Sequence, residues 1–368
     1  MPYMTPLIVM ALVRFISCFT ALAGFSDQFS RALGYLFHEC IEVWIMWQVI
    51  ETEKDFKYLI KGCLYVFLLA CVYGFYEYFT NTNPLAQYKT TLTAQGFNIY
   101  CVDAFRGYRL MSVFEHPIGA GMTFGLIGVF ILTVMVLKKN EIRNKKLAYV
   151  VVAFSMLCVL LSKMRGGILF TLISVFAFMN LRKKKSLYVV GGIAVVAVVM
   201  LPLYSDSLNV FLSLFNTKAQ EAVGGSNLQM RFEQFIVIKR IMNLSPLAGL
   251  GDQFEEYLSS SYLSGALGFE SVFFEEMAKH GLLGVGATLL MIFYSVFKIP
   301  KQYHSREIMF ISLAYWLTYT LTSTPSFRLS LYYFVLFYFI KNTKTYLQSS
   351  SEPSYIKKKR FSIRIKSI

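Results

Sequence analysis

The arginines of this chain are the side chains whose type and position best fit a specific chemistry. A guanidinium group is planar and always charged, and it binds phosphate or carboxylate through two parallel hydrogen bonds, whereas a lysine acts as a point charge. Three arginines in or beside apolar runs, Arg109, Arg165 and Arg231, together predict a cavity at membrane level that binds a phosphate or diphosphate. Alternatively, they anchor the membrane interface or form ion pairs. The carboxylates expected in such pairs are Glu115, Glu233 and Asp252.

Arg165 lies in the segment LSKMRGG (161–167), between two apolar runs that are joined by almost no loop. Its charge is therefore expected at the membrane surface or just below it, where a cation is costly without a partner. The two following glycines allow a sharp reversal or a close approach of another backbone. A tight hairpin whose cations extend to the interface is the alternative.

Arg231 follows the sequence GGSN (224–227), which predicts a loop and a helix start capped by Ser226 or Asn227. The helix is expected to run to about Met242, and helix N-termini favour anions. Arg240 is nine residues further on, about half a turn out of phase at ~100° per residue, so a straight helix cannot direct both arginines to one site. Arg231 is therefore the preferred ligand-binding residue and Arg240 is second.

The composition excludes a water-soluble enzyme. The chain has 368 residues, of which 56% are hydrophobic and 15% charged, against about 25% charged residues in a soluble domain. A membrane-spanning helix needs roughly 20 mostly apolar residues, and we expect an all-α integral membrane protein of about ten such helices. The predicted spans are 6–25, 31–50, 58–79, 116–137, 147–162, 166–181, 186–203, 272–297, 308–322 and 327–341.

The net charge of +15 is mostly explained by topology. Of the 36 Lys and Arg residues, 22 fall at Lys54 and Lys57 and in the segments 138–146, 182–185, 298–306 and 341–368. With ten spans, these segments and the N-terminus face one side, which the positive-inside rule assigns to the cytoplasm. Only 5 of those 22 residues are arginine. The arginine-rich remainder faces outward, where the bilayer and anionic lipid-linked groups, rather than nucleic acid, are the expected partners.

The predicted organisation follows from this topology. Residues 1–79 form three transmembrane helices, 80–115 a first outer loop, 116–203 four helices, and 204–271 a long outer loop with short helices. Residues 272–341 form the last three helices, and 342–368 a basic cytoplasmic tail. A loop of nearly seventy residues is too long to be a simple connection, so it is the expected catalytic loop. The six cysteines have no CxxC spacing and indicate neither a disulfide framework nor a zinc site.

Four segments occur in an informative order: RLMSVFEHPIGAG (109–121), LSKMRGG (161–167), MRFEQF with SPLAGLGDQF (230–254), and ESVFFEEMAKHGLLG (270–284). Over about residues 105–300 this order resembles the O-antigen polymerase and ligase superfamily of bacterial membrane glycosyltransferases. The resemblance implies inverting transfer of a glycan from undecaprenyl diphosphate, outside the cytoplasmic membrane, without a metal ion or other cofactor. Gly281 and Gly284 match a pair of helix glycines of the family, for which close helix packing is the expected role.

The resemblance also assigns roles to residues. Arg165 and Arg231 would bind the departing diphosphate. Where ligases have a histidine before the glycine helix, this chain has Glu270, so Glu270 is the candidate general base and the balance shifts from ligase to polymerase. Asp252, Glu275 and Glu276 compete for the base role. The further expected substrate contacts are Arg106, Arg109, Arg240, Asp252 and His116, although His116 before Pro117 also fits an ordinary helix start.

The sequence therefore predicts a polysaccharide repeat-unit polymerase of the inner membrane with both termini in the cytoplasm. A lipid-linked repeat unit is the acceptor, and a flippase and a chain-length regulator are the expected protein partners.

An O-antigen ligase is the nearest alternative. A flippase or transporter is a second class, and a non-catalytic scaffold a third. The transporter class is suggested by ionisable groups within predicted spans, although pairing of Arg14 with Glu39 or Glu42 would explain them structurally. These groups are Arg14, His38, Glu39, Glu42, Lys61 and Glu77.

Overall fold

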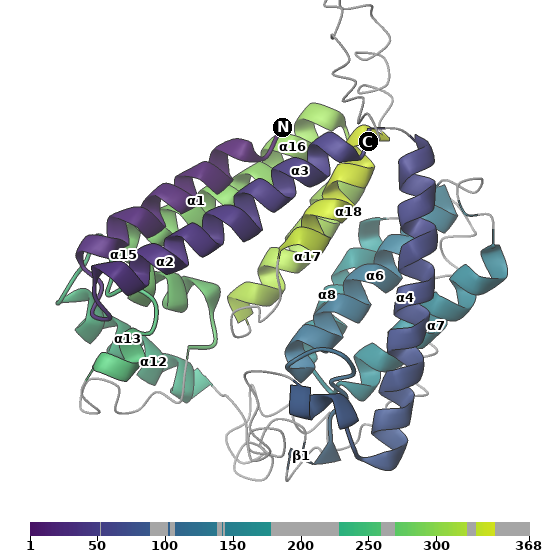
Figure 1. Ribbon diagram of the computed structural model, residues 1–368, viewed down its shortest axis with the longest axis horizontal. Helices are drawn as coiled ribbons and strands as arrows, with labels where there is room; N and C mark the ends of the chain where they lie inside the picture. The colour runs from purple at the N-terminus through teal and green to yellow at the C-terminus, as the bar shows by residue number, and fades with distance from the viewer. Residues whose placement is uncertain are drawn as a thin grey trace, which may run out of the picture.

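The computed structural model describes residues 1–51, 53–88, 102–103, 107–137, 142, 144–177, 228–258, 269–321 and 329–342. These residues form a helical bundle with a short two-stranded sheet at one end (Figure 1). In β1 and β2, Val102 pairs with Tyr108 and Asp103 with Gly107 in antiparallel register. The predicted span 186–203, much of the long outer loop, and the basic tail lie outside the described residues.

The elements follow one another with short connections. The first part of the chain contains α1 (Met4–Ile16), η1 (Ser17–Phe19), α2 (Phe25–Tyr35), the π-helical turn η2 (Leu36–Ile41), α3 (Glu42–Val49), α4 (Glu53–Thr80), η3 (Pro84–Tyr88), β1 (Val102–Asp103) and β2 (Gly107–Tyr108). The middle contains α6 (Pro117–Leu137), α7 (Lys145–Leu161), α8 (Arg165–Ser174) and η4 (Val175–Ala177). The last part contains α12 (Leu228–Met242), α13 (Phe254–Tyr257), α15 (Val272–Phe293), η6 (Tyr294–Lys298), α16 (Ile299–Tyr303), α17 (Arg306–Leu321) and α18 (Ser330–Lys341).

The predicted spans within the described residues fall mainly on helical chain, although the helix in the first span ends at Phe19 and the next begins at Phe25. By length and composition, three of these helical stretches can cross a membrane by themselves: Lys54–Thr80, Pro117–Val136 and Val272–Tyr303. The apolar stretches Met4–Phe19, Gly166–Ala177 and Ser330–Lys341 have only 10–17 residues, and a perpendicular crossing needs about 20. The full set of ten spans is therefore not confirmed, although the membrane character is.

Helix α6 is the centre of its part of the bundle. In an 18-residue stretch of α6, 83% of the residues are buried, against 28% in α4. A helix that is apolar on all sides belongs in such a core, and α6 packs against α4, α7 and α8. Helix α4 presents much of its apolar surface outward. In Figure 1, α17 and α18 lie between this group and the group formed by α1, α2, α3 and α15, and α17 contacts both α8 and α15.

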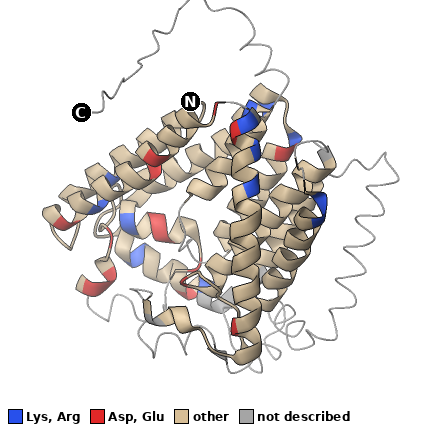
Figure 2. Cartoon of the chain, turned by 45° about the vertical axis from the view of Figure 1, so that its right-hand side comes forward, with Lys and Arg blue, Asp and Glu red and all other residues tan. Residues whose placement is uncertain are grey.

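The described basic segments gather at one end of the bundle. At the end of α18, Lys341 donates hydrogen bonds to the backbone carbonyls of Trp47 and Ile50 at the end of α3. The Tyr3 hydroxyl donates to the Met291 carbonyl at 2.6 Å, which places the N-terminus beside η6 and Lys298. We call this the termini end (Figure 2) and the opposite end, with the sheet and α12 and α13, the loop end. The N-terminus and Lys341 thus lie at one end of the bundle, and the side of the membrane that this end faces stays a prediction.

Helix α15 is broken inside the predicted span at Gly281, where φ is 62° and ψ is −154°. After the break, the amides of Leu282 and Leu283 do not bond back along the helix. They donate instead to the carbonyls of Pro246 and Leu247, at 3.0 and 3.1 Å. Close helix packing was the predicted role of Gly281. The structure adds a second role, because this residue adopts a backbone conformation that is open almost only to glycine.

The carbonyls left free by this break are bonded by the same loop, 246–251. The amide of Leu250 donates to Ala278 and the amide of Gly251 donates to Lys279, both at 2.9 Å. Four hydrogen bonds between the loop and α15 thus compensate for the interrupted helix, and few buried backbone groups are left unpaired. The approach is so close that a Cβ on Gly249 would lie 2.4 Å from the backbone of Lys279.

The same loop is also bonded to the N-terminal helices. The Leu22 amide donates to the Leu250 carbonyl at 2.9 Å. The Ser17 hydroxyl donates to the Ala248 carbonyl at 2.8 Å and lies 3.0 Å from Nδ1 of the buried His280. The loop therefore connects the end of α1, the start of α2 and the broken helix α15 into one unit.

We predict that Gly281→Ala destabilises the protein by at least about 2 kcal/mol. A glycine-only backbone conformation costs of order 1–3 kcal/mol for other residues, and the new Cβ would lie 2.4 Å from the Leu247 carbonyl oxygen. The measurement is thermal unfolding of the detergent-purified chain. Gly286→Ala is the control, because this helical glycine faces open space. Unfolding of Gly281→Ala at the wild-type temperature would show that the break is not required.

Candidate functional site

The loop that carries Arg109 is fixed by a buried carboxylate. Glu77 of α4 is fully buried and accepts hydrogen bonds from the Tyr108 hydroxyl at 3.0 Å, the Met111 amide at 3.0 Å and the Ser112 amide at 2.5 Å. A buried carboxylate is stable only when it is bonded in this way. Residues 108–112 therefore have a defined path across the loop end of α4.

Arg109 lies against the start of α8. The amide of Leu110 donates to the Leu161 carbonyl at 3.1 Å, which ties the loop to the end of α7. The Arg109 Nη1 atom is 3.9 Å from the Met164 sulfur, and the next residue, Arg165, is the first of α8. The structure thus brings together the two predicted segments 109–121 and 161–167. The side chain of Arg165 is not among the described ones.

The N-terminal turns of α6 and α8 lie side by side. A Cβ on Gly167 would lie 3.0 Å from the backbone of Gly121, so the two helices cross at van der Waals contact between glycines. His116 closes the first turn of α6, because its Nδ1 accepts from the Ile118 amide at 3.0 Å. Helix N-termini carry partial positive charge. Two of them, together with Arg109, make the loop end here suited to an anion.

Arg231 and Glu270, which the sequence placed in the same site, are brought together. The Arg231 Nη2 atom is 3.7 Å from the Glu270 Oε2 atom, and it donates a hydrogen bond to the Leu321 carbonyl at 2.6 Å. The Glu270 amide donates to the Gln234 side chain at 3.2 Å. Both charged side chains remain partly exposed, at 23% and 33%. The pair therefore joins α12, the start of α15 and the end of α17 and stays accessible to a ligand.

The two groups of residues lie at the same end of the bundle. Helix α17 packs against α8, and both the end of α17 and the start of α8 lie at the loop end in Figure 1. Arg231 is bonded to the last residue of α17, so its guanidinium belongs to the end that also carries Arg109. Arg240, in the last turn of α12, is nine residues away on the same helix. Arg106 lies outside the described residues.

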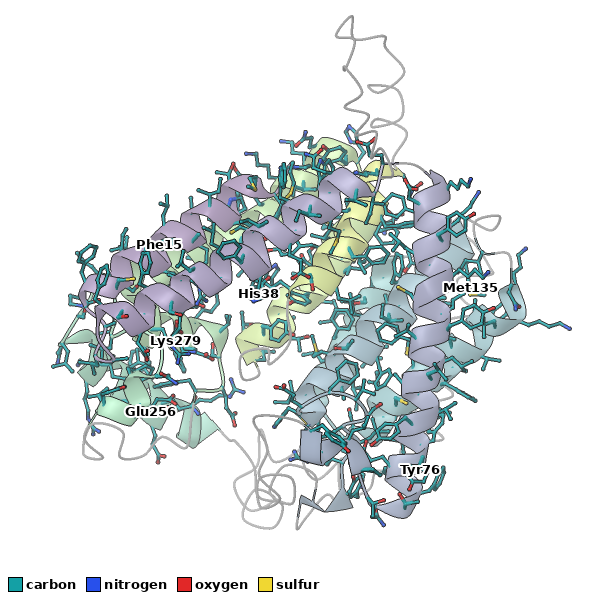
Figure 3. The ribbon with its side chains drawn as sticks, viewed as in Figure 1. Phe15, His38, Tyr76, Met135, Glu256 and Lys279 are labelled. Carbon is teal, nitrogen blue, oxygen red and sulfur yellow. The ribbon has the colours of Figure 1, made fainter. Side chains whose placement is uncertain are left out.

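A second group of charges lies between α1 and α15. Arg14 is 3.6 Å from both Asp252 and Glu276, and Lys279 is 3.7 Å from Asp252 and also pairs with Glu275. Figure 3 shows Lys279 directed into the bundle, whereas Glu256 lies on the outer surface of the loop end. The prediction that Arg14 pairs with Glu39 or Glu42 did not anticipate these partners, which follow Arg14 by more than 230 residues. The sequence did contain a signal for these partners, because the charged residues Glu275, Glu276 and Lys279 lie close together inside an apolar run.

Asp252 is the acidic centre of this group. Its backbone amide donates to the Gln28 Oε1 atom at 2.8 Å, and its carboxylate accepts from the Gln28 side-chain amide group at 3.3 Å. Burial alone would raise the pKa of the Asp252 carboxyl, but the neighbouring Arg14 and Lys279 cations bring the pKa below its usual value. Asp252 is therefore an ionised, structurally bonded carboxylate and fits the base role poorly.

Nothing in the described ranges is arranged as a metal centre, since no group of three or more His, Cys, Asp or Glu side chains there could bind one ion. The groups available to an anionic ligand at the loop end are guanidinium groups and helix N-termini. The groups available to accept a proton are the carboxylates.

Comparison with known proteins agrees with this arrangement. Residues 148–289 match the O-antigen ligase family. The matched segment begins in α7, contains the α8 start, Arg231 and Glu270, and ends in α15 beyond Gly281. No curated protein matches the chain. The matched segment is less than half of the chain, and together with the order of the motifs it supports the resemblance to the O-antigen polymerase and ligase superfamily.

Proposed function

We propose that the protein is a polysaccharide repeat-unit polymerase that transfers a glycan from undecaprenyl diphosphate onto a lipid-linked repeat unit. The observation that carries this proposal is the exposed Arg231–Glu270 ion pair at the loop end, 3.7 Å long. It combines a cation suited to a diphosphate with a carboxylate suited to a general base. Arg109 and the paired starts of α6 and α8 are further anion-binding groups at the same end.

In this proposal the donor itself frees the base. The diphosphate carries more negative charge than a carboxylate, and a guanidinium group binds phosphate oxygens through two hydrogen bonds. The diphosphate therefore competes with Glu270 for Arg231. Once displaced from Arg231, the Glu270 carboxylate is available to an acceptor hydroxyl. The backbone contact of Glu270 with Gln234 keeps the residue close to the bound donor.

The transfer itself breaks one bond and forms one. The acceptor hydroxyl oxygen attacks the anomeric carbon from the face opposite the diphosphate, and its proton passes to Glu270. The bond from the anomeric carbon to the diphosphate oxygen breaks with its electron pair, so the configuration inverts. Arg165, Arg231 and Arg109 stabilise the negative charge that develops on the leaving diphosphate. Guanidinium groups thus take the place of a metal ion in this proposal.

The proposed location is the outer face of the bacterial cytoplasmic membrane, with both termini in the cytoplasm. The position of Lys341 at the termini end, which also holds the N-terminus, supports this orientation through the positive-inside rule. The loop end then faces outward, where ten spans would place the long loop. A flippase that delivers repeat units and a chain-length regulator are proposed partners.

A ligase is the second candidate, favoured by the description of the matched family. The glutamate at position 270, in place of the ligase histidine, favours the polymerase. The flippase alternative loses its main support, because Arg14 is explained by its ion pairs with Asp252 and Glu276.

We predict that Arg231→Ala abolishes polymer lengthening and that Glu270→Gln lowers the transfer rate by about 10²–10⁴-fold, the usual contribution of a general base. The measurement is the length distribution of glycan made by purified variants from lipid-linked repeat units. The controls are Arg306→Ala and Glu256→Gln, two exposed residues away from the pair. Full-length polymer from Arg231→Ala would rule out the proposed donor site.

We further predict that cells with Arg165→Ala display single repeat units on the outer side, since export precedes lengthening in a polymerase pathway. Gel analysis of surface glycan after mild hydrolysis measures this directly. A ligase defect would instead leave long glycan on its lipid diphosphate, and a flippase defect would leave single units inside the cell. Either of these results would contradict the polymerase assignment.

A further inference from the structure

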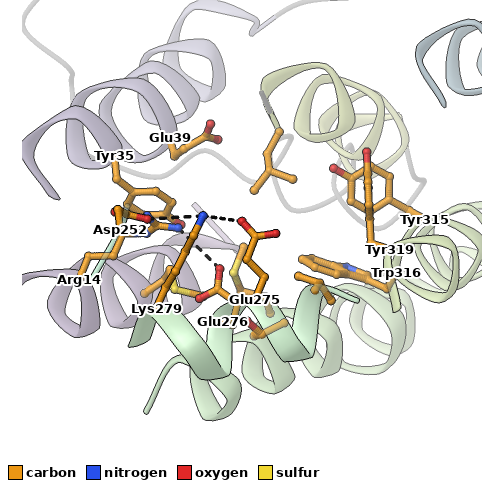
Figure 4. Close-up of a pocket in the computed structure, with 15 residues that line it drawn as sticks. Arg14, Tyr35, Glu39, Asp252, Glu275, Glu276, Lys279, Tyr315, Trp316 and Tyr319 are labelled. Atoms are coloured by element: carbon orange, nitrogen blue, oxygen red, sulfur yellow. Dashed lines mark hydrogen bonds and ion pairs between the residues drawn. The ribbon is translucent and has the colours of Figure 1, made fainter. Parts of the chain in front are cut away.

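A cavity of about 250 Å³ lies between α1, α2, α15 and α17 (Figure 4). Its charged lining comes from the cluster around Arg14 and Lys279. One wall is aromatic, with Trp316, Tyr315 and Tyr319 from α17. Pockets for drug-sized ligands have about 300–1,000 Å³, so this cavity fits a single small ring.

Several residues of the lining carry buried oxygen atoms that have no hydrogen-bond partner among the described residues. They include Oε2 of Glu276 and Oγ1 of Thr288. Glu276 is 7% exposed and Thr288 is 1% exposed. Buried polar atoms are normally bonded, and each exception requires an explanation. A ligand with hydroxyl groups would supply the missing donors.

The charge of the cavity excludes the diphosphate as that ligand. The lining has two cations, Arg14 and Lys279, which are already engaged with carboxylates. The carboxylates of the lining are those of Glu39, Asp252, Glu275 and Glu276. Four carboxyl groups against two cations disfavour an anion and offer oxygen atoms that accept hydrogen bonds from neutral hydroxyl or cationic amino groups.

The aromatic wall has a fixed orientation. The Trp316 indole N–H donates to the Ser295 hydroxyl at 2.8 Å, and its ring lies 5.5 Å from the Tyr315 ring. A held aromatic face beside carboxylates and a hydroxyl is suited to a sugar ring, which has apolar C–H faces and a polar edge.

Two short chain segments connect the lining of the cavity to the proposed reaction site. Val272 lines the cavity two residues after Glu270, and Tyr319 lines it two residues before Leu321, the carbonyl partner of Arg231. The backbone that lines the cavity therefore leads directly to Glu270 and to the carbonyl partner of Arg231.

We infer that this cavity binds one sugar ring of the acceptor glycan, with Glu276 and Thr288 as hydrogen-bond acceptors and Trp316 as the stacking surface. The identification of the sugar as part of the acceptor rests on the proposed function, whereas the binding of a sugar in the cavity does not. It separates two ligands by charge, because the diphosphate binds at the arginines and the hydroxylated ring binds among the carboxylates.

The test uses two probes on the detergent-purified full chain and measures their affinities by isothermal titration calorimetry. The first probe is the repeat-unit oligosaccharide of the producing strain, released from its lipid diphosphate by mild acid. The second is inorganic diphosphate. Glu276→Gln keeps the shape of the cavity, and Thr288→Val removes only the hydroxyl. Their matched controls are the exposed residues Glu256→Gln and Thr80→Val.

We expect Glu276→Gln to weaken oligosaccharide binding at least tenfold and Thr288→Val at least threefold, while diphosphate binding is unchanged. Arg231→Ala should do the reverse. Oligosaccharide affinity equal to wild type in both cavity variants would overturn the inference. Unchanged diphosphate affinity in Arg231→Ala would instead contradict the proposed donor site and leave the sugar-binding result standing.

Discussion

The fold of the site depends on the exchange of backbone hydrogen bonds between α15 and the loop 246–251. A helix interrupted inside a membrane protein leaves amide and carbonyl groups that lipid cannot satisfy. Here the loop satisfies four of them, and in doing so it fixes Asp252, which follows the loop directly, against Arg14 and Lys279. The charged cluster and the cavity that it lines therefore follow from one glycine-dependent break in a helix.

Two chemically opposite regions meet near that break. Guanidinium groups and helix starts characterise the accessible loop end, whereas carboxylates, hydroxyls and aromatic rings characterise the interior between α1 and α17. In the proposed function, the first region would bind the charged part of a substrate and the second its neutral part. A glycan attached to a lipid diphosphate contains both parts. Glu270 belongs to the first region through Arg231, and Val272, two residues further on, lines the second.

Sequence patterns predicted the positions of the helices better than the partners in the ion pairs. Apolar runs located α4, α6 and α15 closely because hydropathy reports burial in lipid or core directly. The motif order led to Arg231 and Glu270, which the structure brings together. The partners of Arg14 were not predicted, since a contact with Glu276 depends on tertiary packing across most of the chain. The Gly281 break was also missed, because a positive φ leaves no trace in hydropathy.

The contact between Arg231 and Glu270 has a consequence for the order of events. If the carboxylate is released only by an arriving diphosphate, an acceptor hydroxyl or a water molecule that enters first meets no available base. Turnover would then follow a compulsory sequence, donor before acceptor. The activated glycan would be protected from wasteful hydrolysis by an ion pair that closes again when the spent carrier departs.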